Sequence, residues 1–170
     1  TIETMRSLDW ELVYQEEMPR VYNYFLYRAG ERQTAEDLTA LTFERAWSLR
    51  NRYRKGQGKV RAWLFGFAKN IFREYLRGHY KELEQSRKLI AVRKLEESAQ
   101  QSEQAEKERL FCLLSRLPQR EQNLIALKYG GGLTNREIAR LCLLSESNVG
   151  SILHRCTQKL RGEWEVSDER

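Results

Sequence analysis

A run of cations in the first half of the chain has the composition of a surface that binds a polyanion. Residues 49–81 contain 10 lysines and arginines and one acidic residue, a net charge of +9 in a chain whose total is +6. Because neutralising phosphates takes several cations in one footprint, this concentration favours a nucleic acid as partner. Side chains three or four positions apart share one face of a helix. Four polar residues have this spacing: Lys69, Asn70, Arg73 and Arg77.

Helices must position these residues, because apolar residues recur with helical spacing along most of the chain and alternating β-branched runs do not occur. The sequence therefore predicts an all-α fold. A first helix is predicted over 9–29, closed by Gly30, with Pro19 kinking or dividing it. A second begins near Thr34, whose hydroxyl and Asp37 would form a start like a capping box. Its aromatic side chains are expected to point inward: Phe43 and Trp47.

Two small helical domains joined by a charged linker are predicted from the distribution of apolar residues. The glycine-containing, basic stretch 51–59 is expected to be a loop, and a wide apolar stripe predicts a third helix over 60–80. The stretch 81–109 is too poor in apolar residues for a core of its own and is assigned as the linker, with helix over part of it left open. The two domains then comprise residues 1–80 and 110–170.

The second domain contains the pattern of a helix-turn-helix, after the three glycines at 130–132. Thr134 and Glu137 have the spacing of a capping box, and Ser145 is expected to cap a longer helix that ends at Gly162. Small polar residues occupy the first turns of that helix, as on a helix that lies in the major groove of DNA. An ordinary helical hairpin is the alternative. The side chains offered to DNA would be Glu146, Ser147, Asn148, Ser151 and Arg155.

Composition and motifs exclude several classes of protein. The 170 residues contain no stretch near the about 20 consecutive apolar residues of a membrane span, and the N-terminus lacks the pattern of a secretory signal. Three cysteines without a CxxC pair indicate reduced thiols in a cytosolic chain, most simply as apolar filling, and no metal site is expected. Motifs of the HExxH, GxSxG and GxxxxGK[ST] types do not occur, so no catalytic residue, no cofactor and no enzymatic activity are predicted.

At two separate places the chain resembles one family, the bacterial RNA polymerase sigma factors of the extracytoplasmic-function (ECF) group. The resemblance rests first on residues 34–47 and 61–77, and then on 117–121, 132–139 and 145–161. It implies that 1–80 is sigma domain two and 110–170 sigma domain four. The protein would then be a cytoplasmic bacterial subunit that binds core polymerase and directs promoter-specific initiation, with double-stranded and melted promoter DNA as further partners.

The resemblance also implies roles for residues of domain two. Its second helix would bind the clamp helices of the polymerase β′ subunit, and Asn70 would read an extruded base of the minus-ten element. An unpaired base needs a polar edge-reader, aromatic or apolar surroundings and nearby cations. The residues implied for core polymerase are Asp37, Thr42, Glu44 and Arg45, taken as exposed. Those implied for the minus-ten element are Tyr53, Lys55, Lys59, Arg61, Trp63, Lys69, Asn70, Arg73 and Arg77.

In domain four, the resemblance implies that the segment 117–129 faces the β flap and that a possible anti-sigma factor contacts the protein. The chain departs from the family by having Gly150 and Ile152 where cations are common and Leu143 where a turn glycine is common, so fewer phosphate contacts are expected. Gly150 would then mark either a close approach to DNA or packing on a protein partner. The residues implied for the minus-thirty-five element are Ser145, Glu146, Ser147, Asn148, Ser151, His154, Arg155 and Lys159.

Two other functions compete with initiation. A stand-alone helix-turn-helix regulator, with a first domain that senses a ligand or dimerises, would leave the net charge of +9 over 49–81 unexplained. A helical adaptor that binds only protein would not need such a basic segment.

Overall fold

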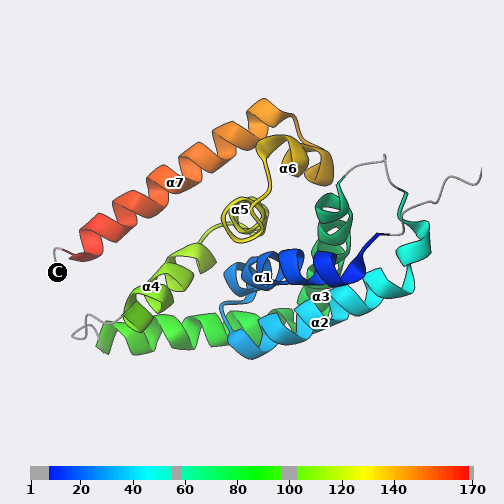
Figure 1. Cartoon of the computed structure of the whole chain (residues 1–170). Helices are drawn as coiled ribbons and strands as arrows, with labels where there is room; N and C mark the ends of the chain where they lie inside the picture. The colour runs from blue at the N-terminus through cyan, green and yellow to red at the C-terminus, as the bar shows by residue number, and fades with distance from the viewer. Residues whose placement is uncertain (1–7, 55–58, 97–102, 169–170) are drawn as a thin grey trace, which may run out of the picture.

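The structure is all-helical over the residues it describes. The computed structural model describes the backbone of residues 8–54, 59–96 and 103–168 (Figure 1). The elements, in chain order, are α1 (Trp10–Ala29), α2 (Arg32–Ser48), η1 (Arg50–Arg52), α3 (Val60–Glu96), α4 (Glu103–Ser115), α5 (Gln119–Ile125), η2 (Ala126–Gly130), α6 (Asn135–Cys142) and α7 (Glu146–Asp168). None of the helices within these ranges combines the length and apolar content of a membrane span.

Helix α1 is one continuous helix with Pro19 inside it, so of the two predicted outcomes, a kink or a division, the division does not occur. Both of its ends are capped, and the cap at Gly30 was predicted. Asp9 Oδ1 accepts hydrogen bonds from the backbone N–H groups of Glu11 (3.1 Å) and Leu12 (3.3 Å). Gly30 has the left-handed backbone conformation (φ 69°) that favours glycine, and its N–H donates to the Leu26 carbonyl at 2.8 Å.

Helix α2 begins two residues before the predicted start, at Arg32, and the predicted capping box at Thr34 was wrong. Thr34 lies inside the first turn, where its hydroxyl donates to a carboxylate oxygen of Glu31 instead of accepting from a backbone N–H. Trp47, expected to point inward, is 52% exposed near the other end of the helix. Its ring lies under the guanidinium of Arg50, with 4.1 Å between Cζ and the ring centroid.

Helix α3 continues to Glu96 and therefore covers much of the segment assigned as linker, while α4 begins at Glu103. The predicted end near residue 80 was wrong because lack of apolar residues shows only that a segment has no core of its own. Residues 81–96 contain no Gly or Pro and are rich in Glu, Lys, Arg, Gln and Leu, all good helix formers. Similarly, α7 extends past Gly162 to Asp168.

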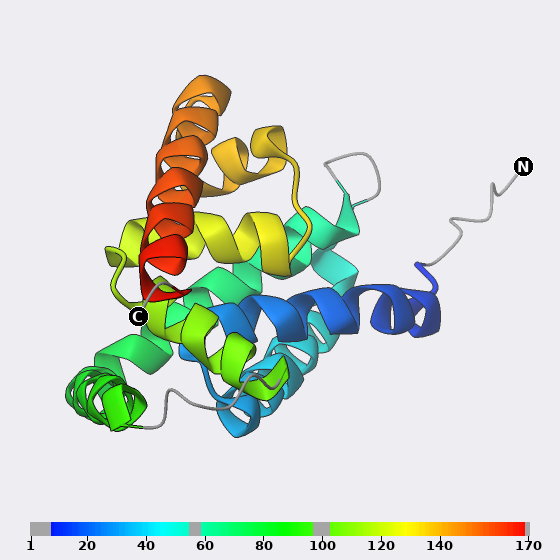
Figure 2. The ribbon, with the colours of Figure 1, turned by 90° about the vertical axis from the view of Figure 1, so that its left-hand side faces the viewer.

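The two predicted domains pack against each other around one shared core. Buried residues of α1 and α3, such as Phe25 and Phe65, belong to the same cluster as Leu124 of α5 and Leu153 of α7. Figure 2 shows α5 and η2 lying above α1, and both contact it. The buried Tyr24 hydroxyl donates to Asn123 Oδ1 at 2.8 Å across this boundary, and burial raises the pKa of Tyr24 to about 12.

Two of the three consecutive glycines permit this close packing. A Cβ atom on Gly130 would lie 2.9 Å from the Asn23 carbonyl oxygen and 3.0 Å from the Tyr24 Cα of α1. A Cβ atom on Gly131 would lie 2.7 Å from the ring of Phe65, which is fully buried. Real Cβ atoms are not found at such distances, so side chains at 130 and 131 would push the two halves apart.

Candidate nucleic-acid interface

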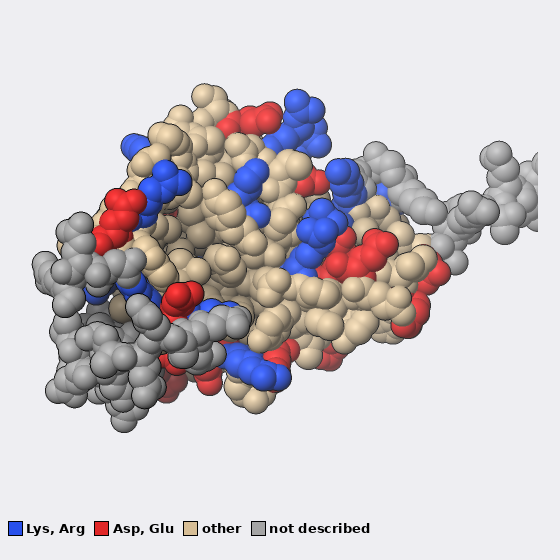
Figure 3. Space-filling view, turned by 60° about the vertical axis from the view of Figure 1, so that its left-hand side comes forward, with Lys and Arg blue, Asp and Glu red and all other residues tan. Residues whose placement is uncertain are grey.

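Three of the four polar residues spaced along α3 are exposed: Asn70, Arg73 and Arg77. The fourth, Lys69, is half-buried and its Nζ donates to the backbone carbonyl of Leu141 in α6 at 2.5 Å. The predicted minus-ten surface therefore contacts the predicted helix-turn-helix directly. On the face drawn in Figure 3, the lysine and arginine side chains of the described residues form several separate groups, with acidic side chains beside some of them.

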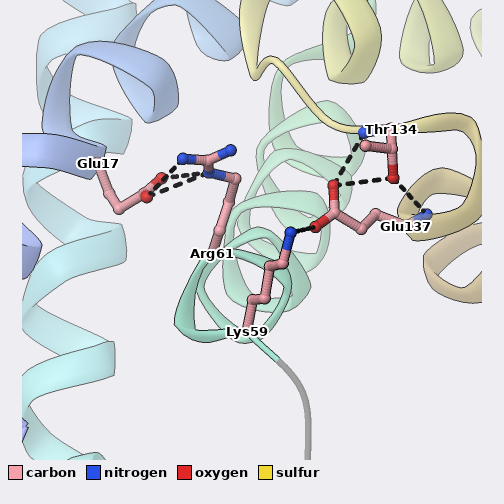
Figure 4. A network of polar contacts seen from close by, with 5 residues as sticks. All are labelled: Glu17, Lys59, Arg61, Thr134 and Glu137. Carbon is pink, nitrogen blue, oxygen red and sulfur yellow. Dashed lines mark hydrogen bonds and ion pairs between the residues drawn. The ribbon is translucent and has the colours of Figure 1, made fainter.

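Arg61 is half-buried and pairs with a buried carboxylate. Its Nε lies 2.9 and 3.1 Å from the two carboxylate oxygens of Glu17, and a terminal nitrogen lies 3.0 Å from one of them (Figure 4). The Glu17 side chain is 4% exposed and that of Arg61 24%. Hydrogen bonding to Glu17 raises the pKa of Arg61 above its ordinary value. The pair fixes the beginning of α3 to the middle of α1.

Lys59, just before α3, contacts the beginning of α6. Its Nζ lies 3.5 Å from a carboxylate oxygen of Glu137, which also closes the predicted capping box (Figure 4). The Thr134 N–H donates to Glu137 at 2.8 Å, and the Glu137 N–H donates to the Thr134 hydroxyl at 3.2 Å. Burial alone would raise the pKa of Glu137, but the bonds from Thr134 and the charge of Lys59 lower it below its ordinary value.

Aromatic rings surround the first turn of α3. The Trp63 ring lies 5.4 Å from that of Tyr53, 5.9 Å from that of Trp10 and 4.8 Å from that of Phe67, measured between centroids. Tyr53 and Trp63 are both half-buried, so each keeps part of its ring accessible. The remaining predicted minus-ten residue, Lys55, lies outside the described residues.

All eight predicted minus-thirty-five residues are exposed, at the start of α7 and along one side of it: Ser145, Glu146, Ser147, Asn148, Ser151, His154, Arg155 and Lys159. The opposite side of α7 is buried through Val149, Ile152 and Cys156. The predicted cap is confirmed, because the Asn148 N–H donates to the Ser145 hydroxyl at 3.1 Å. Ile152 faces the core, so a cation there would not reach DNA.

The two other departures from the family pattern have different structural consequences. A Cβ atom on Gly150 would meet only Asn135 Nδ2, at an ordinary contact distance of 3.6 Å, so packing within the chain does not require glycine there. Leu143, in the turn between α6 and α7, has a left-handed backbone conformation (φ 56°, ψ 45°) and is 91% exposed. A leucine pays a steric cost in this conformation that glycine avoids.

On α2, the structure corrects one of the four residues predicted to bind core polymerase. Thr42, taken as exposed, is fully buried, and its hydroxyl donates to the Leu38 carbonyl at 2.8 Å. Asp37 and Glu44 are exposed. Arg45 is half-buried and donates two hydrogen bonds to Glu74 of α3, at 2.7 and 3.1 Å, which lower the pKa of Glu74.

Three charged residues at helix junctions were not predicted from the sequence. One is Glu17, which pairs with Arg61. The other two are Arg28 and Arg120, which lie where α1, α3 and α5 meet. For Glu17 a signal existed, because it follows Val13 by four positions and precedes Val21 by four, within an apolar stripe. A carboxylate in that register needs a buried partner. The arginines had no comparable signal.

Metal and thiol chemistry do not emerge from the described part of the chain. It contains no cluster of three or more His, Cys, Asp or Glu side chains that could hold a metal ion. All three cysteines are free thiols. Burial raises the pKa of Cys142, and that of Cys156 to about 11, so neither is activated as a thiolate.

Both halves of the chain match known protein families. The family model of sigma-70 region 2 matches residues 13–82, and that of sigma-70 region 4 matches residues 107–160. The ECF RNA polymerase sigma factor SigM of Bacillus subtilis is 36% identical over 162 residues, covering 92% of this chain and 97% of SigM.

Two solved structures have a similar fold. One is the sigma factor RpoE in complex with the anti-sigma factor NepR from Bartonella quintana, with a TM-score of 0.72 and 18% identity, over 93% of this chain and 98% of that one. The other is CnrH in complex with the cytosolic domain of CnrY, with a TM-score of 0.64 and 18% identity, over 92% and 86%.

Proposed function

Because this chain belongs to the ECF group of RNA polymerase sigma factors, which direct transcription initiation, we propose that its two exposed polar faces recognise the two parts of a promoter. One face lies on α3 and the other on α7. The single observation that carries this proposal is that each face is exposed on a helix whose opposite side is buried in the shared core.

The α3 face would read the minus-ten element. Asn70 offers an amide that can donate to and accept from a base edge, and Arg73 lies one helical turn further on. The half-buried rings of Tyr53 and Trp63 would stack on unpaired bases. Lys59 and Lys69 reach this DNA only after they leave Glu137 and the Leu141 carbonyl. Arg61 instead acts as a structural residue through Glu17.

The α7 face would lie in the major groove at the minus-thirty-five element. Asn148, Ser151 and Arg155 follow one another at spacings of three and four residues and can contact base edges. Arg155, Lys159 and His154 would contact phosphates or base edges further along the groove. Only two of the eight predicted residues on this face are lysine or arginine, Arg155 and Lys159, so few phosphates would be neutralised and the salt dependence of this contact should be weak.

Core polymerase would be bound through α2 and through exposed residues of the segment 117–129. Asp37 and Glu44 are available on α2 for the clamp helices of β′, with Arg45 beside them and Thr42 excluded by its burial. In the segment 117–129, Leu124, Ile125 and Leu127 are buried against the rest of the chain, whereas Tyr129 is 53% exposed and can contact the β flap.

An anti-sigma factor is a further proposed partner. Support comes from the likeness in fold to RpoE, which was solved in complex with the anti-sigma factor NepR. In the same compact arrangement, this chain would present a continuous surface of both halves to such a protein.

Run-off transcription tests the proposal. Core polymerase should give transcripts with defined 5′ ends from some members of a promoter library only when this protein is added. A gel-shift assay on the same templates distinguishes this function from that of a stand-alone helix-turn-helix regulator. If the protein bound these DNA fragments without polymerase and supported no initiation, it would act as a stand-alone regulator and the proposal would fail.

A further inference from the structure

A pocket lies at the junction of the two halves, between α1, α3, α5 and the turn from α6 to α7. Its volume is about 330 Å³, within the size range of small-molecule sites. Four cations line it: Arg28 of α1, Lys69 and Arg73 of α3, and Arg120 of α5. Among the described residues, its lining includes no aspartate or glutamate.

Two of these cations are held in place by neutral groups. Arg28 is buried, donates to the Gln119 backbone carbonyl and side-chain oxygen, both at 3.0 Å, and lies over the Phe72 ring with 4.4 Å between Cζ and the centroid. Lys69 donates to the Leu141 carbonyl. These hydrogen bonds are made to uncharged groups, and they fix the positions of the two cations at the pocket.

The other two cations, Arg73 and Arg120, are exposed and come from different halves of the chain. Four positive charges around one small volume repel one another, and this repulsion opposes the closed packing of the halves. An anion in the pocket would reverse the sign of this electrostatic contribution.

Apart from Tyr24 and Asn123, the rest of the described lining consists of apolar side chains and Cys142. Phe72 and Leu124 are buried and contribute to its wall, and Leu144 is half-buried beside them. A bare inorganic ion would leave this wall without contacts, whereas an anion attached to an organic group would cover it.

We propose that this pocket binds a small organophosphate, with its phosphate among the four cations and its organic part on Phe72 and Leu124. A phosphate monoester carries about −1.5 to −2 charges at neutral pH, against one for a carboxylate, and its oxygens match the fork of a guanidinium. The bound ligand links α3 to α5 and therefore stabilises the closed arrangement.

The consequence for transcription rests on the proposed function. A ligand that holds Lys69 and Arg73 in the pocket keeps them from minus-ten DNA, so occupancy should lower initiation. The binding test below uses neither polymerase nor DNA, so its failure would leave the proposed function intact, and a failed transcription assay would leave the pocket intact.

Isothermal titration calorimetry of the full chain with phenyl phosphate tests the site directly. We expect one molecule bound per chain, more tightly than inorganic phosphate, with phenol not bound and benzoate bound about tenfold more weakly. Arg120→Gln should weaken phenyl phosphate binding at least about tenfold, since it removes one charge-assisted contact. Arg140→Gln, an exposed arginine outside the pocket, is the matched control. Equal losses in the two variants, or equal binding of benzoate, would overturn the proposal.

Cysteine alkylation is a second test of ligand binding in the pocket, and it uses the unaltered protein. Cys142 lines the pocket, whereas Cys112 of α4 is half-buried elsewhere and serves as the internal reference. Saturating phenyl phosphate should slow the reaction of Cys142 with iodoacetamide several-fold and leave that of Cys112 unchanged, as followed by mass spectrometry of peptides. Unchanged rates at both cysteines would place the ligand outside the pocket and contradict the proposal.

Discussion

Arg61 of α3 and Glu17 of α1 form an ion pair in which the Arg61 Nε lies 2.9 and 3.1 Å from the two carboxylate oxygens. Glu17 is almost fully buried, so Arg61 takes the place of water as the hydrogen-bond partner of its carboxylate. Arg61, although it belongs to the most basic segment of the chain, therefore stabilises the packing of α3 on α1 instead of binding a nucleic acid.

Glu17→Gln should lower the free energy of unfolding by about 1–3 kcal/mol, less than the full cost of breaking a wholly buried pair, because Arg61 keeps some contact with water. Urea unfolding followed by circular dichroism measures this. The exposed neighbour Glu16 provides the control, and Glu16→Gln should change little. Equal stability of the two variants would show that the pair contributes nothing.

Thr134→Ala should lower the free energy of unfolding by about 1 kcal/mol, because it removes the side-chain acceptor that caps α6. Thr34→Ala is the matched control, since Thr34 has a similar sequence pattern but caps nothing. Chemical denaturation of both variants distinguishes them, and a larger loss for Thr34→Ala would contradict the assignment of the caps.

Leu143→Gly should raise the free energy of unfolding by about 1 kcal/mol, because glycine adopts the left-handed conformation without steric cost and the leucine side chain is exposed. Leu143→Ala keeps a Cβ atom in the same conformation and should give little gain. If alanine stabilised as much as glycine, relief of backbone strain would not be the cause.

Gly130→Ala should destabilise the protein by about 1–3 kcal/mol, because the added methyl group would meet the backbone of α1. Gly162→Ala, inside α7 with no atom within 4 Å of the added carbon, should instead stabilise by about 1 kcal/mol. Thermal unfolding measured by calorimetry gives both values. A melting temperature that rose in Gly130→Ala would contradict the close packing of the halves.

Asn70→Ala should weaken promoter opening about tenfold, if its amide reads an extruded base, while binding to core polymerase stays unchanged. Permanganate reactivity of unpaired thymines measures opening, and gel shift with core polymerase measures binding. Asn23→Ala, an exposed asparagine of α1, controls for loss of an amide. If binding to core polymerase fell as much as promoter opening, Asn70 would not be a residue that reads DNA.

Features set by neighbouring residues were predictable from the sequence. The box formed by Thr134 and Glu137, the cap at Ser145 and the end of α1 at Gly30 depend on contacts within four or five residues. The exposed side of α7 follows equally from its helical period.

Features set by distant contacts were not predictable. Lys69 contacts Leu141 and Arg61 contacts Glu17 because segments 72 and 44 residues apart pack together, and neither cation differs in type from its exposed neighbours. Thr42 is polar, so the sequence pattern predicts that it is exposed. Its hydroxyl can be buried because it donates to the Leu38 carbonyl four residues before it.

The bond between Tyr24 and Asn123 spans 99 residues, which matters while the chain is being made. At about 5–20 residues per second, a ribosome needs roughly 5–20 s between these two residues. During that interval the newly made first half has no second half to pack against, and Lys69 cannot yet donate to the Leu141 carbonyl. During synthesis, the side of α3 that later packs against the second half is therefore uncovered. It is covered only when the last helices leave the ribosome.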